Sequence, residues 1–164
     1  MDSFRDFFVS ELSSREQLDL REVIRDAVTR LEWSHRTCEQ ALPEHPVMLL
    51  GNKERLIQVF EKLLSNAIHA VTNRTDALVR VHCEQTDAGV TVKITDNGSG
   101  MAPELVHRLG DLFYTTKGAL GGTVFDNKTT GTGLGIPIAQ QILRLHGASI
   151  HFQSVLGPGT QVTI

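Results

Sequence analysis

A short run of residues that could hold a ligand, Asp96-Asn97-Gly98-Ser99-Gly100, directly follows an alternating apolar segment. A strand over residues 90–95 would bring the Asp96 carboxylate out at the end of a sheet. Gly98 and Gly100 have no Cβ and would let the backbone come close to something flat. Because Asp-Asn-Gly is also a common turn, this run by itself identifies no ligand.

A second run, Gly131-Thr132-Gly133-Leu134-Gly135, leads into a predicted helix over residues 134–146. Glycines at a helix N-terminus expose backbone N–H groups, and the helix dipole favours an anion there. The run therefore suits a polyphosphate. It is not a dinucleotide-binding Gly-x-Gly-x-x-Gly motif, because position 136 is isoleucine, and the chain has no Gly-Lys pair for a Walker A loop.

The strongest predicted helix, residues 53–71, carries a polar stripe beside its wide apolar face. Asn52 is a suitable N-cap for this helix. Lys62, Asn66 and His69 follow one another at i, i+4 and i+7. A polar amide at the edge of a core needs hydrogen-bond partners. Asn66 therefore has either a structural role or, with Lys62 and His69 beside it, a role toward an anionic ligand.

These candidate residues need a sheet and covering helices to bring them together. The patterns predict helices over 1–17, 20–34, 53–71, 103–109 and 134–146, short strands over 36–42 and 47–50, and hairpins over 77–95 and 150–164. Residues 114–130 have no clear period and predict a long loop, which in a compact domain is usually functional or disordered. Helices and hairpins in mixed order indicate the α+β class, with a sheet covered by helices.

Composition excludes several classes of protein. The 164 residues fit one globular domain, with 40% apolar and 21% charged residues. A formal net charge of −3 gives no general electrostatic reason to bind nucleic acid or an anionic membrane. No apolar run approaches the ~18 residues that span a bilayer. Two cysteines are too few for a disulfide scaffold. The last residues stop within a strand pattern, so we expect a piece of a longer protein.

Four segments, in order, resemble the N, G1, F and G2 boxes of the ATP-binding domain of sensor histidine kinases. They are Asn66 in its helix, Asp96-x-Gly98-x-Gly100, Phe113-Tyr114-Thr115-Thr116-Lys117, and Gly131-x-Gly133-x-Gly135. The family lies in the superfamily shared with gyrase, MutL and heat-shock chaperone ATPases. The resemblance implies a two-layer α/β sandwich of the Bergerat type, with a mixed sheet covered on one face by helices. By the same resemblance, residues 18–164 would be the catalytic domain and residues 1–17 a remnant of the dimerisation and phosphoacceptor hairpin.

The resemblance also implies roles for single residues. Asp96 would accept a hydrogen bond from the adenine amine, with Thr160 near the base. Asn66 would ligate Mg²⁺ through its amide oxygen, in keeping with the preference of Mg²⁺ for oxygen ligands and water. Asn66 and Lys117 are the catalytic candidates, and residues 114–130 match a mobile ATP lid. The other expected ATP contacts are His69, Gly98, Gly100, Met101, Phe113, Thr116, Lys117, Gly131, Thr132, Gly133, Leu134 and Gly135.

Two departures from the family pattern bear on function. Lys62 stands four residues before Asn66, where gyrase-like ATPases carry a water-activating glutamate and many histidine kinases carry asparagine. Glu61 is adjacent but would point about 140° away from Asn66 on a helix, so we expect poor intrinsic hydrolysis. None of the seven histidines is followed by an acidic residue, which is the acceptor pattern of the family. We therefore expect the phosphoacceptor outside this chain.

The resemblance thus implies transfer of the γ-phosphoryl of Mg-ATP to a histidine on a dimerisation domain, for onward transfer to a response regulator. The full-length protein would be a homodimer with this domain in the cytoplasm, whether or not the parent is anchored in the inner membrane. No nucleic-acid or direct membrane contact is expected. The alternatives are a clamp-type ATPase, an anti-sigma serine kinase of the same superfamily, and a nucleotide sensor without catalytic activity.

Overall fold

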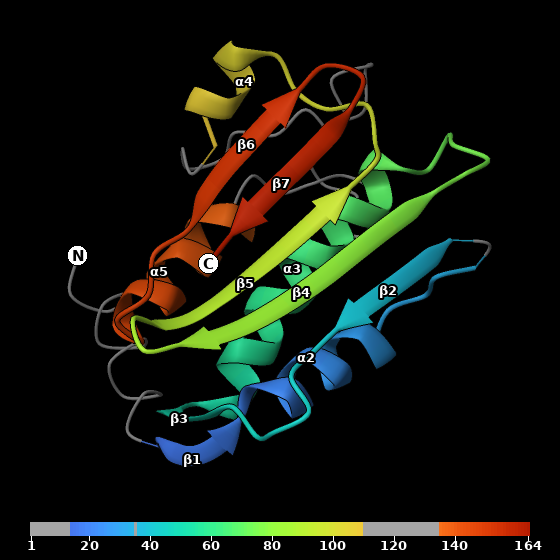
Figure 1. Ribbon diagram of the computed structural model, residues 1–164. Coiled ribbons are helices and arrows are strands. Elements are labelled where there is room, and N and C mark those ends of the chain that lie inside the picture. The colour runs from blue at the N-terminus through green and yellow to red at the C-terminus, as the bar shows by residue number, and fades with distance from the viewer. Residues whose placement is uncertain (1–13, 35, 110–134) are drawn as a thin grey trace, which may run out of the picture.

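The fold has two layers, a five-stranded sheet and a set of helices packed on one of its faces (Figure 1). The computed structural model describes residues 14–34, 36–109 and 135–164. The helices are α2 (Leu20–Thr29), α3 (Lys53–Ala70), α4 (Pro103–His107) and α5 (Gly135–Leu145). The strands are β1 (Glu16–Asp19), β2 (Thr37–Ala41), β3 (Met48–Gly51), β4 (Leu78–Thr86), β5 (Gly89–Asp96), β6 (His151–Val155) and β7 (Gly159–Thr163).

The large sheet is mixed and has the strand order β2-β4-β5-β7-β6. β2 runs parallel to β4, and every other neighbouring pair is antiparallel. Asp96, at the end of β5, pairs with Val79 on one side and Thr160 on the other. A separate sheet of β1 and β3 lies at one end of the molecule (Figure 1). The predicted α+β class and the mixed sheet covered on one face are therefore confirmed.

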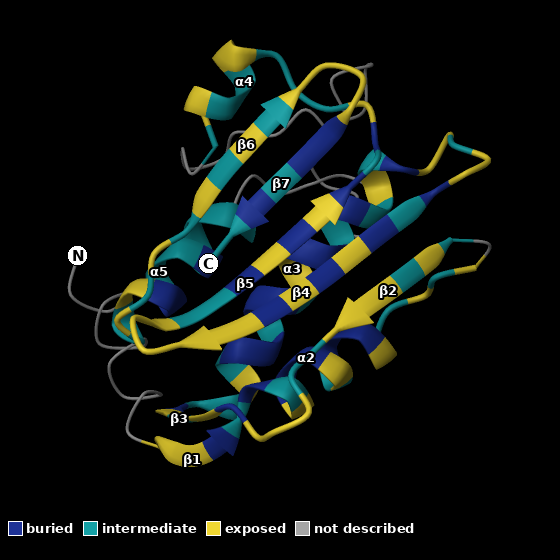
Figure 2. Ribbon diagram, in the orientation of Figure 1, coloured by how far each residue is buried: buried dark blue, intermediate teal, exposed yellow. Residues whose placement is uncertain are grey.

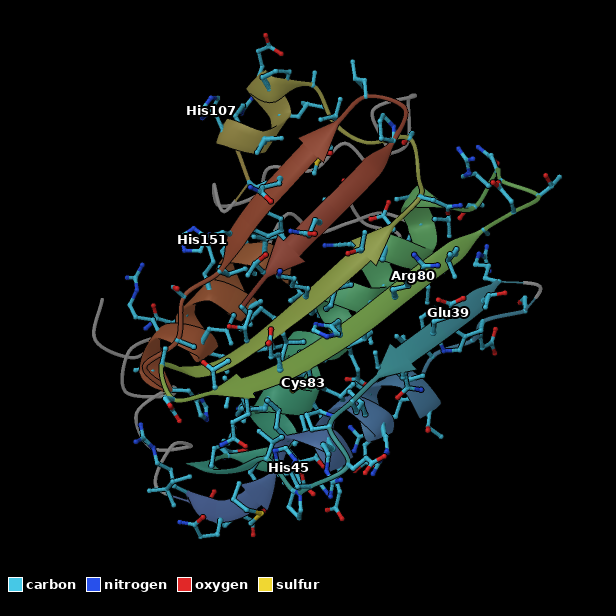
Figure 3. All side chains as sticks on the ribbon, viewed as in Figure 1. Glu39, His45, Arg80, Cys83, His107 and His151 are labelled. Atoms are coloured by element: carbon cyan, nitrogen blue, oxygen red, sulfur yellow. The ribbon has the colours of Figure 1, made fainter. Side chains whose placement is uncertain are left out.

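The core lies between this sheet and α3. Figure 2 shows buried and exposed residues alternating along β4 and β5, because successive strand residues point to opposite faces. The buried face of the helix layer includes Leu56, Val59, Phe60, Leu63, Leu64 and Ala67 of α3. The open face of the sheet is polar, and there Arg80 Nε donates a hydrogen bond of 2.6 Å to Glu39 Oε2 (Figure 3).

Two contacts fix the beginning of α3. Asn52 caps the helix as predicted, because its Oδ1 accepts a hydrogen bond of 3.1 Å from the backbone amide of Arg55. The backbone amide of Asn52 donates to Nε2 of His146 at 3.1 Å, just beyond α5. The other ring nitrogen of His146 lies 2.8 Å from the carbonyl of Ile142 and donates to it. One imidazole therefore ties the end of α5 to the start of α3.

Within the described residues, the predicted helices and strands are found with shifted ends, except at the N-terminus. Residues 16 and 17 were expected to end a helix, but they belong to β1, where Glu16 pairs with Gly51 and Gln17 with Leu50. Pairing with β3 satisfies backbone groups and buries Leu18. The predicted helix 20–34 ends at Thr29. Residues 1–13 and the predicted loop 114–130 lie outside the described residues. No helix in the described part is long and apolar enough to cross a membrane.

Candidate functional site

Asp96 is a carboxylate buried at the end of β5, with only 7% of its surface exposed. Its Oδ1 accepts a hydrogen bond of 2.9 Å from the backbone amide of Gly98. Burial raises the pKa of Asp96 above its ordinary value, and backbone hydrogen bonds from Gly98 and Thr160 act against that rise. Among the described residues, no cation forms an ion pair with Asp96. The carboxylate is thus held by backbone amides, which suits recognition of an uncharged donor such as an aromatic amine.

The turn after Asp96 packs directly on the end of α3. The backbone amide of Ser99 donates to the carbonyl oxygen of Ala70 at 3.3 Å. Gly98 lies so close that an added Cβ would stand 2.5 Å from the same oxygen. Asn66 is one helical turn before Ala70, about 6 Å along the axis. The chain fold therefore brings the predicted adenine-binding turn and the predicted metal ligand to the same end of one helix.

The hydroxyl groups of Thr160 and Ser154 connect the Asp96 turn to the β6–β7 hairpin. Thr160, on β7, is buried, and its Oγ1 lies 2.7 Å from Ser154 Oγ on β6. Ser154 Oγ also accepts a hydrogen bond of 2.8 Å from the backbone amide of Met101. Gly100 has a φ of +68°, and an added Cβ would collide with the carbonyl of Val155. The Asp96 turn is thus fastened to the β6–β7 hairpin as well as to α3.

Ser154 is a site residue that the sequence analysis missed. The signal was present, because alternation in the predicted last hairpin places Ser154 directly opposite Thr160, and the register confirms this. Asn97 was also missed. Its Oδ1 accepts from the backbone amide of Leu78 at 2.9 Å, and its Nδ2 donates to the carbonyl of Asp76 at 2.7 Å. Asn97 thereby holds the turn against the start of β4.

The polar stripe of α3 runs from the Asp96 turn toward α5. Asn66 is half-buried and His69 is exposed. The Nδ1 of His69 lies 2.6 Å from the carbonyl of Ser65. A carbonyl only accepts hydrogen bonds, so Nδ1 carries the proton and Nε2 is left for other partners. At the other end of the stripe, a Cβ added to Gly135 would stand 3.7 Å from Lys62 Cδ. Lys62 therefore lies beside the first residue of α5.

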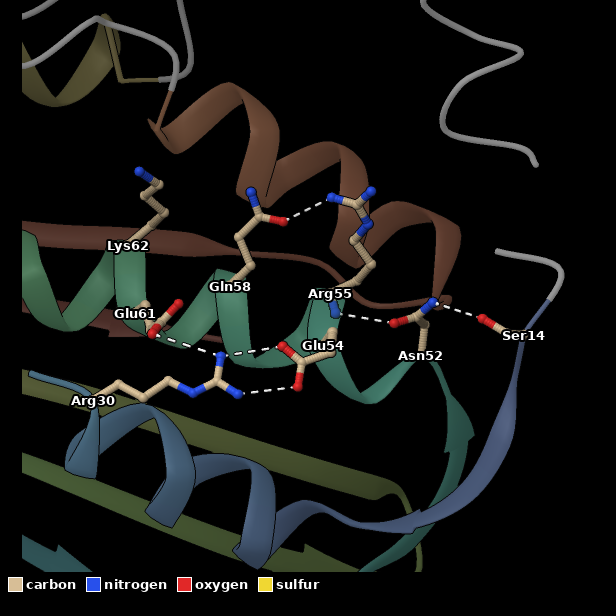
Figure 4. Close-up of a pocket in the computed structure, with 8 residues that line it drawn as sticks. All are labelled: Ser14, Arg30, Asn52, Glu54, Arg55, Gln58, Glu61 and Lys62. Carbon is tan, nitrogen blue, oxygen red and sulfur yellow. Dashed lines mark hydrogen bonds and ion pairs between the residues drawn. The ribbon is translucent and has the colours of Figure 1, made fainter. Parts of the chain in front are cut away.

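Glu61 is directed away from this stripe, as predicted. Its Oε1 lies 3.9 Å from Arg30 Nη1 at the end of α2. Arg30 also forms a pair of hydrogen bonds, of 3.0 and 3.1 Å, with Glu54 (Figure 4). The carboxylates of Glu61 and Glu54 are thus both paired with Arg30 at the end of α2. In the described part of the chain, neither Glu61 nor Glu54 reaches the side of α3 that carries Asn66.

The predicted residues outside the described ranges are Phe113, Thr116, Lys117, Gly131, Thr132, Gly133 and Leu134.

A pocket of about 680 Å³ along α3 is lined by Ser14, Arg30, Asn52, Glu54, Arg55, Gln58, Glu61 and Lys62 (Figure 4). Asp96 does not line it. Among the described residues there is no group of three or more His, Cys, Asp or Glu that could hold a metal.

Comparison with known proteins gives consistent results. The family described as "Histidine kinase-, DNA gyrase B-, and HSP90-like ATPase" matches residues 51–164. The C4-dicarboxylate transport sensor protein DctB of Rhizobium meliloti is 33% identical over 113 residues, 69% of this chain and 16% of its own length. The sensor histidine kinase YvrG of Bacillus subtilis is 36% identical over 107 residues, 65% of this chain and 17% of its own length. The chain thus spans about one sixth of either relative.

A solved structure has the same fold. The mycobacterial sensor histidine kinase MprB superposes with a TM-score of 0.74, over 92% of this chain and 95% of that one. Sequence identity in this comparison is 24%, so the likeness establishes the fold.

Proposed function

This chain belongs to the family of histidine kinase-, DNA gyrase B- and HSP90-like ATPases, and we propose that it is the ATP-binding catalytic domain of a sensor histidine kinase. It would pass the γ-phosphoryl of ATP to a histidine of a dimerisation domain outside this sequence. The P–O bond to ADP breaks as a P–N bond to the imidazole forms. The phosphoryl group would then pass to a response regulator.

The observation that carries this proposal is the buried Asp96 carboxylate beside Gly98 and Gly100. An ionised carboxylate can accept a hydrogen bond from the exocyclic amine of adenine. Guanine has a carbonyl at the equivalent position and cannot donate such a hydrogen bond. The close contact of Gly98 with Ala70 and of Gly100 with Val155 leaves the turn without side chains at these two positions. These two glycines let the turn pack against α3 and the end of β6, and this packing holds the Asp96 carboxylate in place.

Magnesium fits the donor chemistry on α3. Asn66 supplies an amide oxygen, a hard ligand of the kind that Mg²⁺ takes, and Mg²⁺ commonly completes its octahedron with water and substrate phosphates. When bound, the ion would neutralise charge on the phosphates. Asn66 would hold it from α3, and His69 would face the phosphates with Nε2. Lys117 and the glycines of residues 131–135 remain candidates for phosphate contacts.

The positions of Glu61 and Lys62 favour a kinase over a clamp-type ATPase. A clamp-type enzyme needs a base that reaches the attacking water, but Glu61 is directed to Arg30 and Lys62 cannot act as that base while it is charged. The names of the two curated relatives, a transport sensor protein and a sensor histidine kinase, support the same choice.

The proposal includes a homodimeric parent, a cytoplasmic position, and no contact of this domain with nucleic acid or membrane.

Calorimetric titration with Mg-ADP and Mg-ATP tests the adenine assignment. Asp96→Asn should weaken binding of both nucleotides by about 10- to 100-fold, the range for a lost hydrogen bond to a charged group. Asp87→Asn, an exposed aspartate in the β4–β5 turn, is the matched control and should bind as wild type does. Wild-type affinity in Asp96→Asn would refute the assignment.

A steady-state ATPase assay separates the kinase from the clamp-type alternative. The isolated chain should hydrolyse ATP very slowly and should gain phosphotransfer only when its dimerisation domain is present. Sustained turnover without that domain would favour a clamp-type enzyme.

A further inference from the structure

Lys62 is a cation that has no evident structural role among the described residues. It is exposed on α3, and none of the described residues forms an ion pair or hydrogen bond with it. Its neighbours are engaged with one another, since Arg30 binds Glu54 and Glu61. Arg55 Nη1 donates to Gln58 Oε1 at 3.0 Å. In Figure 4 the Lys62 side chain extends away from these pairs.

The position of Lys62 relates it to the nucleotide site. Along α3, the Asp96 turn contacts Ala70, Asn66 comes one turn earlier, and Lys62 one further turn before that. Four residues of helix rise about 6 Å. With the base at Asp96 and the metal at Asn66, the outer end of the phosphate chain would point toward Lys62.

The start of α5 adds a second feature at the same place. Gly135 is the first residue of this 11-residue helix, and a Cβ on it would be 3.7 Å from Lys62 Cδ. The stem of Lys62 thus lies beside the helix end whose dipole favours an anion. A lysine ammonium is a compact point charge with three donors, which suits a phosphate oxygen.

We infer that Lys62 binds the terminal phosphate of the nucleotide and makes the site select the triphosphate over the diphosphate. This inference rests on the proposed function and adds to it a residue that sets specificity. A cation at this position replaces a water-activating base with a group that recognises the phosphoryl to be transferred. Product ADP lacks the terminal phosphate and so loses this contact, which favours its release after transfer.

The test compares two nucleotides on three Lys62 variants by calorimetry with Mg²⁺ present. The probes are ADP and an ATP analogue with a non-hydrolysable β–γ bridge. Lys62→Ala should weaken analogue binding about tenfold and change ADP binding less than twofold. Lys62→Glu should weaken the analogue further, because it places a negative charge against the phosphate. Lys62→Arg should retain most of the preference for the analogue.

Lys93→Ala is the matched control, because Lys93 is an exposed lysine on β5, on the open face of the sheet away from α3. It should leave both affinities unchanged. Unchanged analogue binding in Lys62→Ala, or an equal loss for ADP and the analogue, would overturn the inference while the proposed function stands. Failure of the wild-type protein to bind either nucleotide would instead overturn the proposed function, and the inference with it.

Discussion

Gly98 and Ala70 are in contact through their backbones, and this contact joins the two halves of the candidate site. A Cβ on Gly98 would stand 2.5 Å from the carbonyl oxygen of Ala70 and 2.7 Å from its Cβ. Gly98 follows the Asp96 carboxylate by two residues, whereas Ala70 is the last residue of the helix that carries Asn66. The relative position of the two predicted ligand-binding side chains therefore depends on a glycine at 98.

Gly98→Ala should separate the turn from the helix. Because the obstacle is backbone rather than a flexible side chain, we expect a loss of about 1–3 kcal/mol of unfolding free energy and a loss of nucleotide affinity of at least tenfold. Denaturant unfolding and calorimetry measure the two effects. Ser99→Ala keeps the backbone amide that donates to Ala70 and should be neutral in both. Unchanged nucleotide affinity in Gly98→Ala would remove this turn from the site.

Asn66→Ala should abolish the dependence of nucleotide binding on magnesium. In the wild-type protein we expect ADP to bind more tightly with Mg²⁺ than with a chelator, because the amide oxygen holds the ion. In Asn66→Ala the two affinities should become similar, close to the value without metal. Asn66→Asp retains an oxygen ligand and should keep the dependence on Mg²⁺. A Mg²⁺ effect of full size in Asn66→Ala would show that another residue holds the metal.

Asp96→Asn should leave the folded domain as stable as wild type at neutral pH, or more stable. Burial raises the pKa of Asp96 in the folded protein, so the folded state holds its proton more tightly than the unfolded state does. Stability contributed by this group is therefore present at low pH and is lost as the pH rises through the raised pKa. Thermal unfolding of both proteins at pH 4 and pH 7 measures the difference. A variant that is less stable than wild type at pH 7 but not at pH 4 contradicts this sign.

Asp19 should make the domain sensitive to acid. The hydrogen-bonded Arg21 side chain lowers the pKa of Asp19 from 3.8 to about 2, and Asp19 Oδ1 also accepts from the backbone amides of Arg21 and Val47 at 3.1 Å. A lowered pKa gives stability that is complete above pH 4 and is lost as the pH falls toward 2.

Asp19→Asn should therefore cost about 2 kcal/mol at pH 7 and much less at pH 2. Asparagine can still cap α2, so the difference reports mainly the Arg21 ion pair. Urea unfolding at the two pH values checks this, with Glu39→Gln as the control because its salt bridge with Arg80 is exposed. An equal cost at both pH values would show that the loss does not come from the ionised Asp19 carboxylate.

Local chemistry in the sequence was enough to determine most of the elements. Asn52 as N-cap, the last hairpin around residues 157–159 and the apolar face of residues 53–71 depend on neighbours within a few positions. The same holds for the direction of Glu61, because helical geometry alone turns it away from Asn66. Four short motifs in order also indicate a nucleotide site, and they do so without reference to any tertiary contact.

Contacts between distant segments were decided only by the tertiary structure. The pairing of β1 with β3 overrode a local helix signal at residues 16–17, because it buries Leu18 and satisfies backbone groups. The links from Met101 to Ser154 and from Ser99 to Ala70 join residues 53 and 29 positions apart. No local pattern encodes them, because each depends on how the sheet and helix layers stack. Sequence thus indicated which residues are candidates for binding a nucleotide, and packing decided that the turn after Asp96 lies against the end of the helix that carries Asn66.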